Sequence, residues 1–240
     1  MPVAPDLSVV VPVYRSAETL RSLHARICGA LDTAGVVYEV VFVDDASPDD
    51  SRRVLDELAA GDSRVIVRAS GRNLGQHRAV LETLPHTRGD WIVVLDADLQ
   101  DPPEAILDLL RKGREGFAAV FAGRRGRYES AGRLLTSRVF KRLLNLGCGV
   151  PPDAGLFVAM NREMADRLLA FRARRPYLVA MMGCTGLPLA SVPVARSARE
   201  IGRSTHGSLA RLRMGLLGVG WVLVWRLGGG RKARRPTSGN

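Results

Sequence analysis

Two hydrophobic patterns alternate along the first half of the chain. Short continuous runs of β-branched and other apolar residues are typical of strands buried on both faces. Between them, apolar residues recur every three or four positions, as on one face of a helix. The runs predict strands at Leu7–Val13, Val36–Val43, Val65–Arg68, Trp91–Leu95 and Phe117–Ala122. The intervening segments predict helices at Ala17–Thr33, from Ser47 with Pro48 in the first turn, at Gly75–Thr87 and at Pro102–Gly113.

This regular alternation predicts an α/β fold, with a doubly wound, mostly parallel sheet flanked by helices. Ligands of such sheets bind beyond the carboxyl ends of the strands. The second half of the chain is less regular. It predicts a basic loop at Gly123–Arg133, helices at Leu134–Leu146, Arg162–Phe171 and Ser208–Arg226, and strands at Ala154–Met160 and Leu189–Ala195.

Charge divides the chain unevenly. The net charge is −5 over residues 1–100 and +16 over residues 101–240, which gives +11 in total. An anionic partner of the second half is therefore expected: phosphate, nucleic acid or a membrane surface. An arginine-rich composition is the alternative source of the excess, because only three of the 35 basic residues are lysine.

Cysteine content and hydropathy narrow the class of protein. The three cysteines, Cys28, Cys148 and Cys184, contain no C-x-x-C pair, so neither a disulfide framework nor a zinc–cysteine site is expected. A secretory signal requires a basic segment before its apolar run, and no such segment precedes the first apolar run of this chain. The uncharged run Met214–Trp225 has 12 residues, fewer than the roughly 18 that a membrane span needs. We expect a cytoplasmic protein, either free or peripheral at the inner face of the membrane.

Carboxylates gather where two of the expected strands end. Asp44 and Asp45 follow the second strand, and Asp96 and Asp98 follow the fourth. Since parallel strands end at the same edge of a sheet, these side chains should lie on one edge. Hard divalent cations prefer such oxygen ligands and keep positions free for substrate phosphates, and Gln100 adds an amide oxygen.

Some of these acids could have a purely structural role. Two other kinds of nucleotide site, the Rossmann dinucleotide site and the P-loop, are not supported by the sequence. Asp98 or Asp101 can cap the next helix, because Asp-Pro-Pro is a good helix start. The first strand is not followed by G-x-G-x-x-G, and the chain has no Walker A loop. A dinucleotide site of the Rossmann type and a P-loop are therefore not supported.

Four motifs, in this order, carry a family resemblance: Ser8–Tyr14 (SVVVPVY), Val43–Ser47 (VDDAS), Arg72–His77 (RNLGQH) and Leu95–Pro103 (LDADLQDPP). The chain resembles the family 2 inverting glycosyltransferases of the GT-A fold. It is most similar to their polyprenyl-phosphate sugar transferases, the dolichol-phosphate-mannose-synthase-like branch. The likeness covers roughly residues 7–215.

The resemblance implies a role for each matching residue. The nucleotide is expected at Pro12, Tyr14, Asp44, Asp45, Gly75, Gln76 and Asp96. Asp98 and Gln100 are expected to hold Mg²⁺ or Mn²⁺ on the donor diphosphate. The acceptor phosphate is expected at Arg124, Arg133, Ser137 and Arg199, and the catalytic residues are Asp96, Asp98 and Asp153.

The implied reaction moves one sugar, with inversion, from a GDP- or UDP-linked donor to a polyprenyl monophosphate. The GT-A catalytic domain should span residues 1–207, with a nucleotide-sugar half at about 1–122 and an acceptor half at about 123–207. An amphipathic or interfacial helix at 208–227 and a disordered basic tail at 228–240 should follow. An anionic membrane surface or a membrane partner subunit is the further partner expected.

Departures from the branch leave two alternatives open. Arg15-Ser16 replaces the usual Asn-Glu, no arginine follows Phe157, and Ser204-Thr205-His206 replaces Ser-Lys-Tyr. Transfer to a soluble hydroxyl acceptor, with Asp153 as the base, is the first alternative. The second is a nucleic-acid binder that uses the basic half. It would leave the acidic edge without a purpose, so no nucleic acid is expected.

Overall fold

The protein is described by a computed structural model, which covers residues 4–125, 145, 147–171, 173 and 175–196. The expected helix at Ser208–Arg226 and the tail at 228–240 lie outside these residues. So does the expected helix at Leu134–Leu146, apart from Asn145. The boundary near residue 207 therefore stays a prediction.

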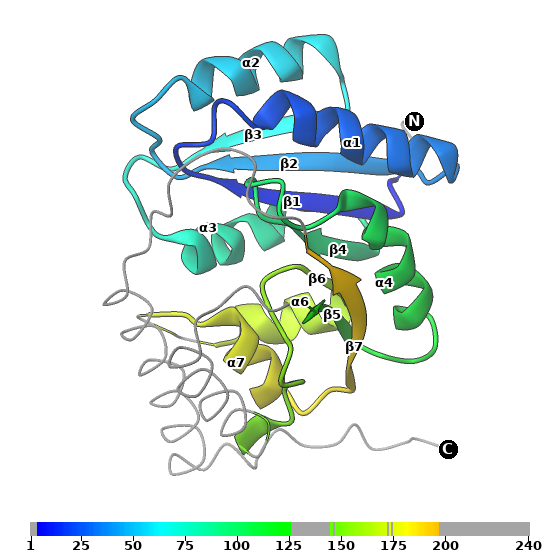
Figure 1. The fold of residues 1–240 in the computed structure, drawn as a ribbon. Helices are drawn as coiled ribbons and strands as arrows, with labels where there is room; N and C mark the ends of the chain where they lie inside the picture. Colours follow the sequence, from blue (N-terminus) through cyan, green and yellow to red (C-terminus); the bar gives the residue numbers. More distant parts are fainter. Residues whose placement is uncertain (1–3, 126–144, 146, 172, 174, 197–240) are drawn as a thin grey trace.

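A seven-stranded sheet forms the centre of the fold, in the order β3-β2-β1-β4-β6-β5-β7 (Figure 1). All neighbouring strands pair in parallel except those that contact β6. The mostly parallel sheet predicted from the hydrophobic runs is thereby confirmed. The strands are β1 (Leu7–Val13), β2 (Tyr38–Asp44), β3 (Val65–Ala69), β4 (Trp91–Val94), β5 (Ala119–Arg125), β6 (Val158–Asn161) and β7 (Leu189–Ala195).

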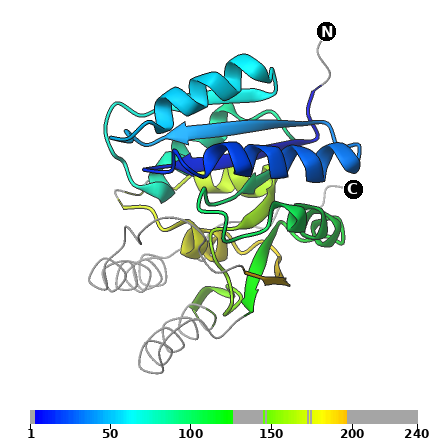
Figure 2. The same ribbon diagram turned by 45° about the horizontal axis from the view of Figure 1, so that its top comes forward.

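Helices cover both faces of the sheet and make a three-layer α/β/α sandwich (Figures 1 and 2). The helices are α1 (Leu20–Thr33), α2 (Ser51–Gly61), α3 (Gln76–Thr83), α4 (Ile106–Gly113), α6 (Arg162–Leu169) and α7 (Leu178–Cys184), with 3-10 turns at η1 (Leu84–His86) and η2 (Pro103–Ala105). One core joins the sheet to α1, α2 and α4, and a second joins it to α3, α6 and α7. Alternating residues of β1 serve both cores: Val9 and Val11 face α1, and Val10 faces α3.

The topology brings many chain segments to one edge of the sheet. Since β1 to β5 and β7 all run in the same direction and β6 runs opposite, their carboxyl ends meet the amino end of β6 there. The arrowhead of β2 points to this side, at the left of Figures 1 and 2. We call it the carboxyl edge, made of residues 14–16, 44–47, 70–76, 95–101, 123–125, 153–157 and Arg196. The opposite amino edge comprises residues 5–7, 35–39, 62–65 and 87–91.

Some predicted boundaries differ from the structure: β6 begins at Val158 rather than Ala154, and two further differences have identifiable reasons. Helix α2 begins at Ser51 rather than Ser47, and Asp50 precedes it without a side-chain cap. Ser47 does not cap because its hydroxyl bonds the end of β1: it accepts from the Arg15 N–H at 3.3 Å and donates to the Val13 carbonyl at 3.4 Å. Residues 123–125, predicted as the start of a loop, extend β5, because they pair with residues 193–195 of β7.

The predicted strand at Leu189–Ala195 is confirmed as β7, and helix α7, which ends at Cys184, precedes it. Within the described ranges, no helix has both the length and the apolar character that crossing a bilayer requires.

Candidate functional site

Backbone strain concentrates at the carboxyl edge. Three described residues other than glycine adopt the left-handed conformation: Arg15 after β1 (φ 55°), Ala46 after β2 (φ 55°) and Leu99 after β4 (φ 59°). Each such residue costs on the order of 1 kcal/mol, and strain of this kind gathers where a binding site needs a particular backbone shape. The strained turns therefore mark the carboxyl edge as the candidate site.

The acidic pair after β2 organises the neighbouring loop. Asp45 is buried, and its two carboxylate oxygens accept from the backbone N–H groups of Leu74 at 2.6 Å and Gly75 at 2.8 Å. Asp44, also buried, accepts from the Ser47 N–H at 3.0 Å. Gly75 has a φ of 82°, which glycine adopts without cost. The Asp44 carbonyl also accepts from the Ser70 N–H at 2.9 Å, so both residues of the pair fix the loop that leads into α3.

That loop connects the second acidic cluster to the first. The side-chain amide of Gln76, the first residue of α3, donates a hydrogen bond to the Asp96 carboxylate. The structure therefore brings Asp45, Gly75, Gln76 and Asp96 together at one place on the carboxyl edge.

The segment after β4 directs its two carboxylates outward. Ala97 between them is buried, and its carbonyl accepts from the Thr19 hydroxyl at 2.6 Å. Asp96 and Asp98 are half-buried, on the accessible side of the segment. Asp98 accepts from the backbone N–H of Gln100 at 3.2 Å, so Gln100 orients this carboxylate through its main chain. The set offers the oxygen ligands that a hard divalent cation prefers.

An arginine that the sequence interpretation missed completes this cluster. Arg196, directly after β7, makes a bidentate ion pair with Asp101 at 2.7 and 2.9 Å, and its guanidinium lies 3.9 Å from Asp96. The side chains of Arg196 and Asp101 are 18% and 2% exposed. Burial acts to lower the pKa of Arg196, but the hydrogen bond to Asp101 and the charges of Asp98 and Asp96 outweigh it and raise that pKa. The guanidinium therefore stays charged and offsets the acidic segment.

This pairing also decides one of the alternatives that the sequence left open. Asp101 does not cap the following helix: its carboxylate binds Arg196, and the 3-10 turn η2 follows Pro102 without a side-chain cap. The sequence signal was weak, because Arg196 is one of many arginines and lies 95 positions from its partner.

Asp153 lies on the β5–β7 side of the carboxyl edge. Its Oδ2 accepts from the Ser191 hydroxyl at 3.2 Å, whereas its buried Oδ1 has no hydrogen-bond partner among the described residues. A Cβ on Gly123 would lie 2.0 Å from Oδ2, so this carboxylate packs against the strand only because residue 123 is glycine. Neither Ser191 nor Gly123 was predicted to shape the site around Asp153.

The remaining predicted residues are placed in part. Pro12 is buried in β1, and Tyr14 is half-buried just beyond it, with the Arg15 guanidinium 5.4 Å from its ring centre. Arg124 lies in β5, paired with Val194. The predicted acceptor residues Arg133, Ser137 and Arg199 lie outside the described residues.

The carboxyl edge does not present a compact all-acidic metal cluster. Among the described residues, three potential metal ligands lie within 4.8 Å of one another at His24, Cys28 and Asp62, on α1 and after α2, away from the carboxyl edge. A cation at Asp98 would therefore need oxygen ligands from a bound substrate, as a diphosphate provides.

The fold and its site define a class of protein. A mostly parallel α/β sandwich with an Asp-x-Asp segment after a central strand, facing a loop held by a second acidic pair, is the GT-A architecture of nucleotide-sugar enzymes. Residues 8–169 match the glycosyl transferase family 2 domain. The chain belongs to glycosyl transferase family 2.

Curated relatives point to one branch of the family. An undecaprenyl-phosphate 4-deoxy-4-formamido-L-arabinose transferase from Shewanella sediminis is 36% identical over 204 residues, which are 84% of this chain and 62% of that protein. The protein of the same name from Klebsiella pneumoniae is 34% identical over 216 residues, 89% of this chain and 66% of that protein. The chain thus spans just under two thirds of the length of these relatives.

Solved structures agree on the fold. Glucosyl-3-phosphoglycerate synthase from Mycobacterium tuberculosis, in complex with Mn²⁺, UDP and glucosyl-3-phosphoglycerate, superimposes with a TM-score of 0.67 at 25% identity, over 93% of this chain and 80% of that one. A mannosyltransferase from Pyrobaculum calidifontis, in complex with GDP-Man and Mn²⁺, gives a TM-score of 0.60 at 17% identity, over 98% and 78% of the two chains.

Proposed function

We propose that the protein transfers one sugar from a nucleoside diphosphate sugar to a polyprenyl monophosphate. One observation carries the proposal: the hydrogen-bonded series from Asp45 through Gly75 and Gln76 to Asp96, which joins the ends of β2 and β4 beside the half-buried Asp98. This is where a doubly wound sheet binds a nucleotide. The names of the relatives supply the acceptor class.

The donor occupies the part of the carboxyl edge nearest β1 to β4. Asp44 accepts from N–H groups of the base, Asp45 and Asp96 border the ribose, and Pro12 and Tyr14 line the pocket beside them. Asp98 and Gln100 would hold Mg²⁺ or Mn²⁺. When bound, this ion neutralises the charge that develops on the leaving nucleoside diphosphate.

The reaction itself needs little proton transfer. An oxygen of the acceptor phosphate attacks the anomeric carbon from the face opposite the diphosphate. A carbon–oxygen bond forms there while the bond to the leaving diphosphate oxygen breaks, so the configuration inverts. A phosphate oxygen is already anionic near neutral pH, and what it needs is a cationic cradle. Arg124, Arg133, Ser137 and Arg199 provide it, within a catalytic domain that spans residues 1–207.

The excess of positive charge in the second half fits the site of this reaction. A lipid acceptor lies in a membrane, and an interfacial helix at 208–227 with the basic tail at 228–240 would hold the enzyme at an anionic inner leaflet. The enzyme is then cytoplasmic and peripheral.

A second candidate acceptor rests on Asp153. Its Oδ1 has no hydrogen-bond partner among the described residues, and Ser191 holds its other oxygen at 3.2 Å. Such a carboxylate is able to accept a proton from an acceptor hydroxyl, which a neutral acceptor requires and a phosphate does not. Transfer to a soluble hydroxyl compound is therefore the alternative.

One experiment separates the two acceptors. Release of UDP or GDP is measured with a panel of nucleotide sugars and Mn²⁺, in the presence of undecaprenyl phosphate, of undecaprenol or of neither. The proposal predicts release that depends on undecaprenyl phosphate and that undecaprenol does not support. Release that needs a free hydroxyl and is lost in Asp153→Asn would favour the alternative acceptor.

A further inference from the structure

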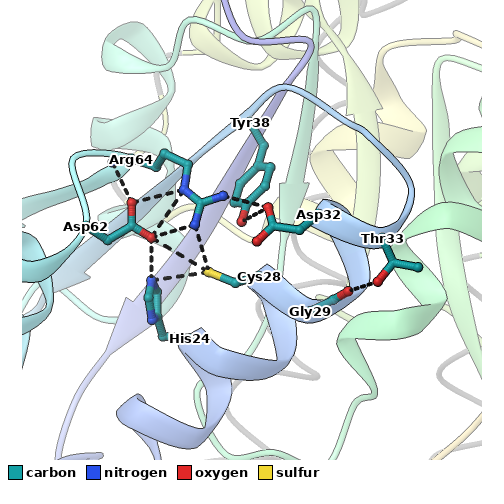
Figure 3. A network of polar contacts seen from close by, with 8 residues as sticks. All are labelled: His24, Cys28, Gly29, Asp32, Thr33, Tyr38, Asp62 and Arg64. Carbon is teal, nitrogen blue, oxygen red and sulfur yellow. Dashed lines mark hydrogen bonds and ion pairs between the residues drawn. The ribbon is translucent and has the colours of Figure 1, made fainter.

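A second cluster of chemically active side chains lies far from the carboxyl edge, between helix α1 and the turn that leads into β3. His24 and Cys28 lie one helical turn apart on α1, and Asp62 follows α2. Figure 3 shows the imidazole, the thiol and the carboxylate pointing toward one another. The proposed sugar transfer uses none of the three.

The distances in this cluster match those of a metal site. Nε2 of His24 lies 3.2 Å from Oδ2 of Asp62 and 3.4 Å from Sγ of Cys28, and Sγ lies 3.8 Å from Oδ2. A tetrahedral ion with bonds of about 2.0–2.3 Å separates nitrogen, oxygen and sulfur ligands by roughly 3.3–3.6 Å. Little side-chain movement would therefore bring all three atoms within bonding distance of one ion.

The ligand types select the ion. Mg²⁺ and Ca²⁺ prefer oxygen, whereas one imidazole, one thiolate and one carboxylate suit Zn²⁺. The side chains of His24 and Asp62 are 15% and 16% exposed, so solvent reaches the cluster and a water molecule can occupy the fourth position. The ligands and their exposure thus fit a zinc site with one open position.

Arg64 supports the two anionic ligands from outside the triangle. Its Nε donates to Oδ1 of Asp62 at 3.0 Å, and its Nη2 lies 2.9 Å from Oδ2 of Asp62 and 3.7 Å from Sγ of Cys28. Part of its charge is balanced by Asp32, 2.6 Å from Nη1, and its guanidinium stacks 4.7 Å from the ring centre of Tyr38. Such outer contacts orient metal ligands in known sites.

Charge balance is compatible with occupation. The ligand is the thiolate of Cys28, so binding releases the thiol proton to solvent. A zinc ion with one thiolate and one carboxylate is then neutral, and Arg64 keeps its contact with Asp32. The sequence predicted no zinc–cysteine site because it has no closely spaced cysteine pair, whereas here a histidine and a cysteine are paired at i and i+4.

We propose that His24, Cys28 and Asp62 form a Zn²⁺ site that joins helix α1 to the turn before β3, separate from the cation of the carboxyl edge. Occupation should stabilise this end of the molecule, because the three ligands come from two segments that fold together.

Cobalt spectroscopy tests the proposal directly, because a Co²⁺–thiolate bond gives an intense near-ultraviolet absorption that oxygen ligands do not. The purified protein is titrated with Co²⁺ in excess Mg²⁺, which occupies the oxygen-only site at Asp98. We expect the thiolate absorption, its disappearance on addition of Zn²⁺, and at least about tenfold weaker Zn²⁺ binding in Cys28→Ser and His24→Ala. Cys148→Ser is the matched control and should bind as the wild type does.

A second measurement needs no variant. Alkylation of each cysteine in the wild-type protein is followed by mass spectrometry with and without Zn²⁺. We expect Zn²⁺ to slow the modification of Cys28 at least about tenfold, as a metal-bound thiolate requires, and to leave the rate at Cys148 unchanged. The proposal would be overturned by a missing thiolate band, by a band that persists in Cys28→Ser, or by Cys28 alkylation that Zn²⁺ does not slow.

Discussion

The two edges of the sheet treat their buried carboxylates differently. At the amino edge, Glu39 is 1% exposed, and both of its oxygens are satisfied: the Ser8 hydroxyl donates at 2.7 Å, the Arg88 N–H at 2.8 Å and the Arg88 side chain at 2.7 Å. Gly89 lies close beside this network and donates to the Ser8 hydroxyl at 2.9 Å. A Cβ on Gly89 would lie 2.5 Å from the Ser8 nitrogen, so the backbone here is packed too tightly for any side chain.

At the carboxyl edge only some carboxylates are satisfied in this way: both oxygens of Asp45 and of Asp101 are bonded, whereas other groups are not. The turns are strained, Asp98 is half-buried, and one oxygen of Asp153 lacks a partner among the described residues. Unsatisfied and strained groups cost stability, and sites that bind ligands tolerate that cost. The difference supports the proposal that the carboxyl edge binds the substrates, whereas the amino edge stabilises the fold.

The largest expected effect is a difference in turnover between variants at the two ends of β4. Asp98→Ala, just past the carboxyl end of β4, should reduce sugar transfer at least about 10³-fold, because loss of the proposed cation ligand would forfeit several kcal/mol of transition-state stabilisation. Thermal stability should change little. The control Asp90→Ala, exposed at the amino end of β4, should retain full turnover. Rates of nucleoside diphosphate release measure both, and equal rates would remove the distinction between the edges.

The next effect concerns the ion pair between Arg196 and Asp101 at the carboxyl edge. Arg196→Ala leaves the buried Asp101 charge unpaired and should lower the free energy of unfolding by about 3 kcal/mol. It should also strengthen Mn²⁺ binding, since it removes a positive charge that lies 3.9 Å from Asp96 and opposes a second cation. Arg196→Lys retains the charge but not the bidentate geometry, so its stability should lie between those of the wild type and Arg196→Ala. Urea denaturation and Mn²⁺ titration follow these changes; a fully stable Arg196→Ala protein would contradict the assigned role.

A smaller effect should appear at the amino edge without a catalytic consequence. Glu39→Gln removes a charged acceptor from a buried network and should cost about 2 kcal/mol of stability. Turnover per folded molecule should stay at the wild-type value. Glu82→Gln, an exposed change on α3, is the control and should shift stability by less than about 0.5 kcal/mol. If Glu39→Gln abolished turnover in folded protein, the amino edge would not be purely structural.

The smallest effect compares two glycines. Gly35 follows α1 near the amino edge with a φ of 64°, and Gly75 precedes α3 with a φ of 82°; neither has an atom within 4 Å of an added Cβ. Alanine at either position should cost about 1 kcal/mol of stability through backbone strain. Gly75→Ala alone should raise the KM for the donor, because it moves the backbone next to Asp45. A similar KM in both variants would mean that the nucleotide is misplaced.

Much of the fold was predictable because its signals are local. The β-branched run of Leu7–Val13 and the helical spacing of Leu20, Leu23, Ile27 and Leu31 each fix an element and its buried face, and the structure buries these residues. The acids at Asp44 and Asp96 were expected on one edge because strand direction determines where they lie. The structure confirms that placement.

The missed features depend on contacts between distant residues. Arg196 meets Asp101 only once β7 has paired with β5, and Gly123 makes room for Asp153 only once β6 has paired with β5. No local pattern marks one arginine among many as the partner of a buried acid. The predicted start of α2 was wrong for a related reason, since the hydroxyl of Ser47 bonds the end of β1 rather than its own helix.

Amide hydrogen exchange tests most directly whether binding is confined to the carboxyl edge. The protein with Mn²⁺ is compared with and without UDP, and with and without GDP, and protection is read segment by segment. We predict that one of the nucleotides slows exchange at residues 14–16, 44–47, 73–76 and 95–101, and leaves residues 35–39 and 87–91 unchanged. Protection centred on the amino edge, or a bound nucleotide that protects none of the carboxyl-edge segments, would contradict the account.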